Sequence, residues 1–395
     1  MTHGTGVCWG VVGHMAAVNG VMPKDCWDWT FSCWPSGGMI DLPEGPAPGL
    51  LLGSAREQTM TVTRSASELL ARALSRERLA PADAMSGAMF ERVVVGSDRY
   101  FVKRFGFASD WIMRVSGDRV GRQYLVWRAG IMDRSPDCID HTVVAMGVDG
   151  AGEEAVLTIV MREVGEYLVP PGDAVLPSGQ HAGFIAHMAA LHSAFWGWDD
   201  QIGLTTMAQR VRFFAPEVIA AELAAPVVPT PVAAAAAGWD ALPARSPVLW
   251  QLARLVHDRP EVITEPLSRT PRTFLPGDWK LGNLGSHPDG RTILLDWTLP
   301  GAGPACWELC WYLALNRARL PEPKQAVIDR FRAALEQQGT GTGGWWQRQL
   351  DLCLIGIMAT FGWEKALGDE GELAWWEAAA AAAAIRQHIP IRDSR

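Results

Sequence analysis

Three oxygen-bearing side chains lie close together between residues 274 and 297, and their types suit phosphate chemistry. Asp278 and Asn283 are five residues apart in a loop interrupted by glycines, and Asp296 ends a short apolar run that is typical of a strand. Carboxylate and amide oxygens suit Mg²⁺, which shares its remaining positions with water and phosphates. The set would bind magnesium and still leave one carboxylate to orient a hydroxyl group for attack.

Phosphoryl transfer also needs positive groups, because the protein contributes mainly positioning and charge neutralisation. Lys103 falls on the second strand of a predicted hairpin, where its ammonium would reach the α- and β-phosphates of ATP. Lys280, two residues after Asp278, would lie over the γ-phosphate. Ser86 and Gly87 precede the hairpin and form a candidate small-residue loop over the phosphates, a signal that carries little weight alone.

Two regions of different periodicity must position these residues. Up to residue 164 the pattern predicts strands over 90–95, 99–105 and 155–161, with helices over 65–79 and 118–129. Beyond residue 165 it predicts helices over 179–196, 216–224, 247–257, 307–319, 322–338, 345–360 and 373–388. We therefore expect a two-lobed α+β fold, with a sheet-rich nucleotide-binding lobe over 59–164 and a helical catalytic and acceptor-binding lobe over 165–395.

Two segments show no sign of carrying chemistry. Residues 1–58 are rich in Gly, Pro and Trp without periodicity, so we expect a disordered extension or a start upstream of the native one, with Met60 as the candidate start. Residues 220–247 are rich in Ala and Pro and are interpreted as a variable insertion between helices.

Composition excludes several classes of protein. The 395 residues carry 35 Lys and Arg against 43 Asp and Glu, and this acidic balance argues against a general nucleic-acid binder. The body of the chain has no apolar run long enough to span a membrane. Within the uncharged stretch 1–23 no Lys or Arg precedes the apolar part and glycines interrupt it, so we expect no signal segment and a cytoplasmic protein. The seven cysteines form no C-x-x-C pair, and Cys306 and Cys310 are expected to pack in the core.

The motif Pro276-Gly277-Asp278, followed by Asn283 and then by Asp296-Trp297, resembles the catalytic signature of the aminoglycoside phosphotransferase-like family of small-molecule kinases. The resemblance spans about residues 61–390, and it implies the protein-kinase fold with ATP and Mg²⁺ in the cleft. By the same resemblance Asp278 is the catalytic base, Asn283 and Asp296 are magnesium ligands, and Lys103 binds phosphate. The backbone of Arg162, Glu163 and Val164 would hold adenine.

The sequence departs from this signature at two positions. Pro276 replaces the usual histidine, whose hydrogen bonds brace the catalytic loop. Gln123 stands where such kinases have a helix glutamate to pair with the strand lysine, and it would accept a hydrogen bond from Lys103 without supplying a charge. Asp118 is a possible substitute. These departures keep open a nucleotide-binding pseudokinase with a regulatory or scaffold role as the alternative to an enzyme.

The reading that the sequence favours is ATP-dependent phosphorylation of a hydroxyl group on a small molecule, such as an aminoglycoside, an amino sugar or a sugar. His192 is expected to be a core residue, and Glu308 either caps its helix or orients the catalytic loop. Acids in the helical region would attract a cationic acceptor or form a solvated face: Asp199, Asp200, Glu364, Asp369, Glu370 and Glu372.

Overall fold

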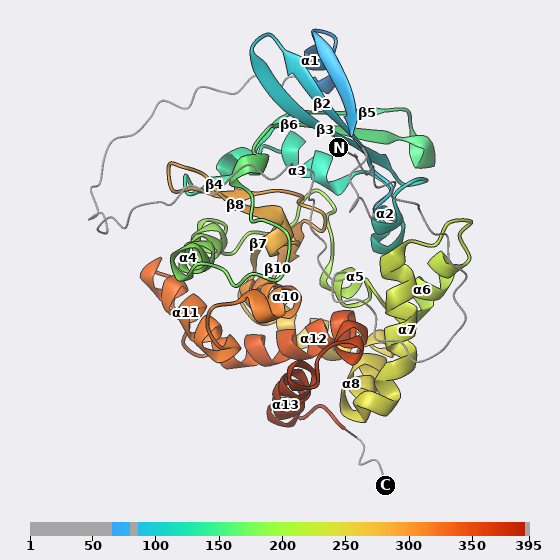
Figure 1. Cartoon of the computed structure of the whole chain (residues 1–395). Coiled ribbons are helices and arrows are strands. Elements are labelled where there is room, and N and C mark those ends of the chain that lie inside the picture. The colour runs from blue at the N-terminus through green and yellow to red at the C-terminus, as the bar shows by residue number, and fades with distance from the viewer. Residues whose placement is uncertain (1–64, 80–85, 392–395) are drawn as a thin grey trace, which may run out of the picture.

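The computed structural model describes residues 65–79 and 86–391, and its first part is a sheet. Five antiparallel strands lie in the order β1 (Ser75–Leu79), β2 (Met89–Val95), β3 (Asp98–Gly106), β6 (Val156–Arg162) and β5 (Val143–Asp149) (Figure 1). Three short helices accompany the sheet: α1 (Ala66–Leu70), α2 (Trp111–Ser116) and α3 (Arg122–Arg128). The predicted hairpin and the predicted strand over 155–161 are confirmed.

The second part of the chain is mainly helical. Its helices are α4 (Ser178–Ala194), α5 (Met207–Val211), α6 (Pro216–Leu223), α7 (Thr230–Arg245), α8 (Pro247–Asp258), α9 (Glu261–Ser268), α10 (Ala305–Asn316), α11 (Lys324–Gln337), α12 (Trp346–Leu367) and α13 (Glu370–Arg386). Two small sheets, β10 (Gly301–Gly303) with β7 (Thr273–Leu275) and β4 (Ile139–Asp140) with β9 (Thr292–Leu294) and β8 (Leu284–Ser286), lie between the large sheet and the helices (Figure 1). The predicted α+β fold class is confirmed.

The register of β3 decides which way its lysine points. Successive strand residues face opposite sides of a sheet. Val102 therefore packs with Val93 and Val160 in a small cluster on one face. Lys103, paired with Ile159 on β6, projects from the other face, which looks toward the helical part.

The prediction of one helix over 65–79 is wrong beyond Leu70. Residues Ser75–Leu79 form β1, which pairs antiparallel with β2. Charged residues of β1 pair with opposite charges on the neighbouring strand β2. The Glu77 carboxylate lies 3.0 Å from the guanidinium of Arg92. Cross-strand pairing, which a local helical pattern does not reveal, decides this segment.

The interpretation of 220–247 as a variable insertion is also wrong. Most of this segment is α7, which packs against the long central helix α12. The indole N–H of Trp239 donates a hydrogen bond of 2.7 Å to the carbonyl of Phe214. Gly238 lies so close to α12 that a Cβ there would overlap the carbonyl group of Trp363. The absence of a side chain at Gly238 lets the backbones of α7 and α12 approach each other here.

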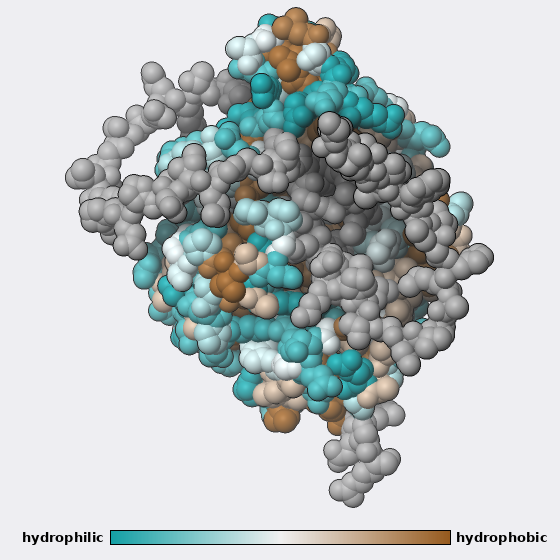
Figure 2. Space-filling model, in the orientation of Figure 1, coloured by the Kyte–Doolittle hydropathy of each residue, from teal (hydrophilic) through white to brown (hydrophobic). Residues whose placement is uncertain are grey.

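Hydrophilic residues cover most of the sheet part on the face drawn in Figure 2, with apolar residues at its outer tip. In the described part of the chain, none of the helices combines the length and the apolar character that crossing a membrane requires. The predictions for 1–58 and for Met60 concern residues outside those that the structure describes.

The close contact of α7 with α12 predicts the effect of Gly238→Ala. The added methyl group collides with backbone, so the variant should lose about 1–3 kcal/mol of unfolding free energy. Gly183→Ala on α4 is the matched control, because its Cβ would meet open space and the change should be neutral or stabilise by roughly 0.5–1 kcal/mol. Urea unfolding measures both, and equal stability of the two variants would contradict the packing described here.

Candidate active site

The loop after β7 holds Asp278 in a fixed orientation. The amide of Asn283 donates to the Asp278 carbonyl at 3.0 Å and to its Oδ2 at 2.8 Å. Lys280 Nζ lies 2.8 Å from the same oxygen, and the indole N–H of Trp311 donates to Oδ1 at 3.0 Å. Three donors therefore fix this carboxylate, and the predicted catalytic residues Asp278 and Lys280 form an ion pair.

The loop is braced although Pro276 replaces the histidine of the related signature. The backbone N–H of Gly277 donates to Glu308 Oε1 at 2.8 Å, and the N–H of Leu281 donates to Asn316 Oδ1 at 3.0 Å. Both acceptors belong to α10. Gly277 has a φ of +92°, and a Cβ there would overlap the carbonyl of Leu299. Of the two roles predicted for Glu308, the structure supports orienting the loop.

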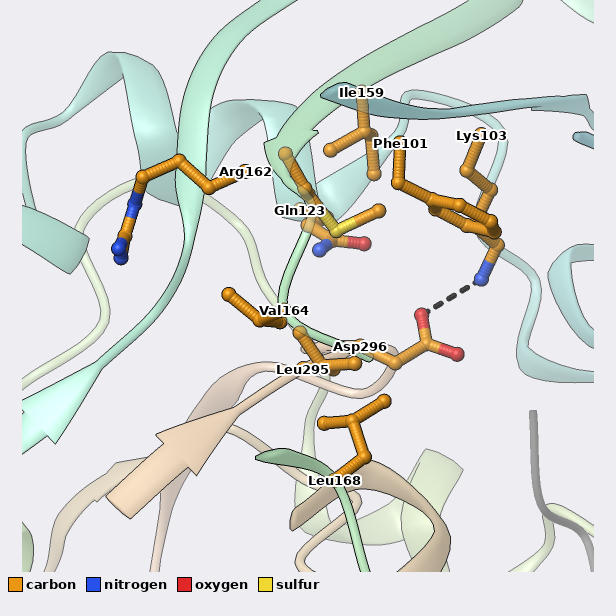
Figure 3. Close-up of a pocket in the computed structure, with 10 residues that line it drawn as sticks. Phe101, Lys103, Gln123, Ile159, Arg162, Val164, Leu168, Leu295 and Asp296 are labelled. Atoms are coloured by element: carbon orange, nitrogen blue, oxygen red, sulfur yellow. Dashed lines mark hydrogen bonds and ion pairs between the residues drawn. The ribbon is translucent and has the colours of Figure 1, made fainter. Parts of the chain in front are cut away.

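Lys103 and Asp296 connect the sheet to the helical part. Lys103 Nζ lies 2.8 Å from Asp296 Oδ1, and the two residues are 193 positions apart in sequence. Asp296 adopts a left-handed φ of +53°, an unfavourable conformation for a residue other than glycine, just after β9. Figure 3 shows this pair at one end of the pocket, with the phenyl ring of Phe101 beside the lysine.

The first pocket is an apolar slot between the sheet and the loop that carries Asp296. It spans about 550 Å³, including open solvent at its mouth, and is lined by Phe101, Lys103, Gln123, Ile159, Met161, Arg162, Val164, Leu168, Leu295 and Asp296. Phe101 and Ile159 approach from the sheet, and Leu168 and Leu295 from the opposite side (Figure 3). A flat apolar ring would fit between these layers.

The three predicted adenine-binding residues differ in what they present to this slot. The guanidinium of Arg162 points away from it and pairs with Asp140 (Figure 3). Glu163 pairs with Arg92 at 2.7 Å, and its N–H donates to the carbonyl of Arg99 at 3.2 Å. Val164 lines the slot with its side chain. A contact to adenine from this segment would therefore use backbone groups other than the Glu163 N–H.

The second pocket is polar and adjoins the first. Ser86, Lys103, Asp110, Asp118, Gln123 and Asp296 line it together with Ile112 and Thr298. Burial raises the pKa of Asp110 to about 6, against the opposing effect of the nearby Lys103 ammonium. Gly87 has a φ of +88°, and its backbone lies against the carbonyl of Ser109. The predicted phosphate-loop residues thus lie beside the predicted phosphate-binding lysine.

Two acids that line this polar pocket, Asp118 and Asp110, have different roles. Asp118 accepts hydrogen bonds from the backbone N–H groups of residues 120, 121 and 122 at 2.9–3.2 Å, so it caps α3. Asp110, which the sequence analysis missed, is the buried acid whose charge interacts with Lys103. The signal available in the sequence was an aspartate directly before an apolar helical stretch, which is typical of an N-cap.

The third pocket lies next to Asp278 and is mainly apolar, with four aromatic side chains. It spans about 360 Å³, including open solvent at its mouth, and is lined by Ile112, Phe213, Phe214, Asp278, Lys280, Thr298, Leu299, Trp311, Leu315 and Phe361. The first and second pockets share Lys103, Gln123 and Asp296, and the second and third share Ile112 and Thr298. The three spaces therefore adjoin one another, from an apolar slot through a polar centre to an aromatic end.

The residues predicted to bind magnesium offer a suitable oxygen. Asn283 Oδ1 is buried and has no hydrogen-bond partner among the described residues, while the amide nitrogen is bonded to Asp278. A cation would satisfy this oxygen. Within the described residues no cluster of three or more His, Cys, Asp or Glu side chains forms a metal site, and the predicted set contains only two carboxylates and this amide.

Several residues singled out in the sequence lie outside the site. His192, Cys306 and Cys310 are fully buried, and burial lowers the pKa of His192 to about 3. Most of the acids considered for a cationic acceptor have other partners: Asp199 pairs with Arg272, Asp200 caps a turn, Glu364 pairs with Lys365, Asp369 caps α13 and Glu372 pairs with Lys324. None of these acids, nor Glu370, lines the third pocket.

No protein-family model and no curated protein sequence matches the chain. A thermostable mutant of aminoglycoside phosphotransferase APH(4)-Ia, in a ternary complex with ADP and hygromycin B, is 12% identical over 82% of this chain and 97% of its own, with a TM-score of 0.43. A microcompartment-associated aminopropanol kinase is 13% identical over 84% and 95%, with a TM-score of 0.42. Choline kinase LicA from Streptococcus pneumoniae is 12% identical over 80% and 96%, with a TM-score of 0.40.

These identities and TM-scores carry no argument about this chain, and its function has to follow from its own side chains. An antiparallel sheet precedes a mainly helical part, with a lysine on β3 and the Asp278, Asn283 and Asp296 set where the two parts meet. The arrangement of a sheet-rich part before a mainly helical part is the α+β fold class that the sequence predicted.

The buried Glu308 predicts a pH-dependent stability difference. Burial raises its pKa from 4.5 to about 7, against the hydrogen bond from Gly277 and the Arg210 guanidinium. Between pH 4.5 and 7 the Glu308 carboxyl group therefore takes up a proton when the protein folds. Its contribution to the unfolding free energy is complete below pH 4.5 and is lost as the pH rises through 7. Glu308→Gln lacks this titration, so its unfolding free energy relative to wild type should rise from pH 5 to pH 8 by up to about 3 kcal/mol.

Urea unfolding at pH 5 and pH 8 measures the difference in unfolding free energy between the variant and wild type. The contributions of the other titrating groups cancel in this difference, because both proteins contain them. Glu308→Ala is the control, because it removes the acceptor of the Gly277 N–H and should destabilise the protein at both pH values. A Glu308→Gln difference that stays constant with pH would show that this carboxyl group does not titrate in the range.

Proposed function

We propose that this protein is an ATP-dependent phosphotransferase that phosphorylates a hydroxyl group of a small molecule. The observation that carries the proposal is the sequence of three adjoining pockets, with Lys103 and Asp296 in the first two and Asp278 in the third. An apolar slot suits a nucleobase, a polar centre with a buried lysine suits phosphates, and a fixed carboxylate beside them suits a hydroxyl acceptor. The sheet-rich lobe over 59–164 would bind the nucleotide, and the helical lobe over 165–395 would supply catalysis and the acceptor site.

Each site residue would act from the position in which its present contacts hold it. Asp278 would orient the acceptor hydroxyl and take its proton, with the donors Asn283 and Trp311 keeping the carboxylate in place. Lys103 would leave Asp296 in part to contact the α- and β-phosphates, and Lys280 would offset charge on the transferred phosphoryl group. Asn283 and Asp296 would hold Mg²⁺, which when bound supplies further neutralisation of the phosphate charge.

The alternative is a nucleotide-binding pseudokinase, and its main support is Gln123 in place of a glutamate. Gln123 lines the first two pockets without bringing a charge to Lys103. The buried acid Asp110 weighs against this alternative, because it lines the same pocket as Lys103 and its charge interacts with that lysine. Asp278, Asn283 and Asp296 are all present, and the loop that carries them is braced. These contacts favour an enzyme.

The proposal predicts the behaviour of Asp278→Ala. The rate of magnesium-dependent ADP release from ATP, measured with a pool of aminoglycosides, amino sugars, neutral sugars and amino alcohols, should fall by about 10²–10⁴-fold. The reason is that the group that orients the hydroxyl and takes its proton is lost. ATP should still raise the melting temperature, since Asp278 does not line the nucleotide slot. The matched control is Asp289→Ala, which removes a half-exposed carboxylate that pairs with Arg291 in the turn before β9 and should leave turnover unchanged. Wild-type turnover in Asp278→Ala would remove this residue from the mechanism.

A further inference from the structure

The pocket beside Asp278 has a lining that restricts what the acceptor can be. Seven of its ten lining residues are apolar or aromatic, and the polar ones are Asp278, Lys280 and Thr298. Trp311 and Phe361 meet edge to face with ring centroids 4.7 Å apart, and Phe213 and Phe214 do so at 4.8 Å. Aromatic side chains from α10, α12 and the turn after α5 thus supply four of the seven apolar lining residues.

The charges that line this pocket balance. Asp278 brings one negative charge and Lys280 brings one positive charge, and the two groups lie 2.8 Å apart. Asp278 also accepts hydrogen bonds from Asn283 and Trp311. Among the described residues that line the pocket there is no second acid. A cationic acceptor would therefore meet a lysine without an uncompensated carboxylate to bind it.

The pocket also has few partners for a polyol. Beyond the ion pair, Thr298 is the polar side chain among the described lining residues. A sugar would bury several hydroxyl groups against aromatic and aliphatic walls, and buried hydroxyls without partners bind poorly. An apolar ring gains from the same walls, because it removes apolar surface from water.

We propose that the acceptor is an uncharged, largely apolar alcohol, in which a hydrophobic body fills the aromatic pocket and one hydroxyl reaches Asp278. This inference rests on the proposed function and names its substrate class. In the reaction the hydroxyl oxygen forms a bond to the γ-phosphorus, and the bond from that phosphorus to the bridging oxygen of ADP breaks. The hydroxyl proton passes to Asp278 and then to solvent, which leaves a phosphate monoester and ADP.

A pair of alcohols tests the inference directly. Hydrocinnamyl alcohol and phenylalaninol share the phenyl ring, chain length and primary hydroxyl, and the second carries an added ammonium group. The purified chain, with ATP and Mg²⁺, should phosphorylate hydrocinnamyl alcohol with a kcat/KM at least about tenfold higher than phenylalaninol. Choline, glucose and kanamycin should be poorer acceptors than hydrocinnamyl alcohol.

A substitution at the rim of the pocket should change this preference. Ile112 is half-buried on α2 and lines both the polar and the aromatic pockets. Ile112→Glu adds the uncompensated acid that the wild-type pocket lacks, so the preference should move toward phenylalaninol by about tenfold. Ile112→Gln has nearly the same shape without the charge and should keep the wild-type preference. An identical change in both variants would show that shape, and not charge, sets the preference, and would overturn the inference.

Binding measured without nucleotide separates this inference from the proposed function. Isothermal titration should show hydrocinnamyl alcohol binding at least about tenfold more tightly than phenylalaninol, and Phe361→Leu should weaken that binding without changing the affinity for ATP. Phosphorylation of kanamycin, choline or glucose in preference to hydrocinnamyl alcohol would overturn the inference and leave the kinase in place. Selective binding of hydrocinnamyl alcohol without phosphorylation of any acceptor would uphold the pocket chemistry and overturn the proposed function. Binding of neither aromatic alcohol would overturn the inference.

Discussion

The ion pair between Lys103 and Asp296 is the contact on which the site depends. It joins the third strand of the sheet to the loop that follows β9, and its side chains are only 8% and 12% exposed. Removing two charges from water carries a large desolvation penalty. The attraction between the charges offsets that penalty only where both side chains are held in good geometry. The register of β3 holds the lysine, and the left-handed backbone of Asp296 holds the carboxylate. The two lobes therefore meet at a point that already carries charges suited to phosphates.

Charge balance also governs the rest of the site. Asp278 pairs with Lys280 and accepts hydrogen bonds from the N–H groups of Asn283 and Trp311. Glu308 fixes the same loop by accepting a hydrogen bond from the backbone N–H of Gly277. These contacts fix the direction of the carboxylate that would face an acceptor. They also leave the aromatic pocket without the spare negative charge that a cationic acceptor would need. The same pairing that orients the proposed base thus restricts the proposed substrate.

The sequence predicted the parts of this site that lie close together along the chain. Asp278, Asn283 and Asp296 could be recognised by spacing, and Lys103 by its place in a hairpin. Asp110 and Phe361 could not, because they come from separate helices that only the folded chain brings to the pocket. Local pattern also failed where distant partners decide the structure: cross-strand pairing makes 75–79 a strand, and packing on α12 makes most of 220–247 a buried helix.

The most direct test of the central claim is the affinity for MgATP of the Lys103→Met variant, measured by isothermal titration. Methionine keeps most of the length of the side chain and removes the charge, and circular dichroism checks that the fold is retained. Arg104→Met is the matched control, because Arg104 is the next residue on β3 and pairs with Glu91, away from the pockets. If Lys103 is the phosphate-binding lysine, its variant should bind MgATP at least about tenfold more weakly than wild type, and the Arg104 variant should bind like wild type. Equal affinity in all three proteins would contradict the assignment of this cleft as the nucleotide site.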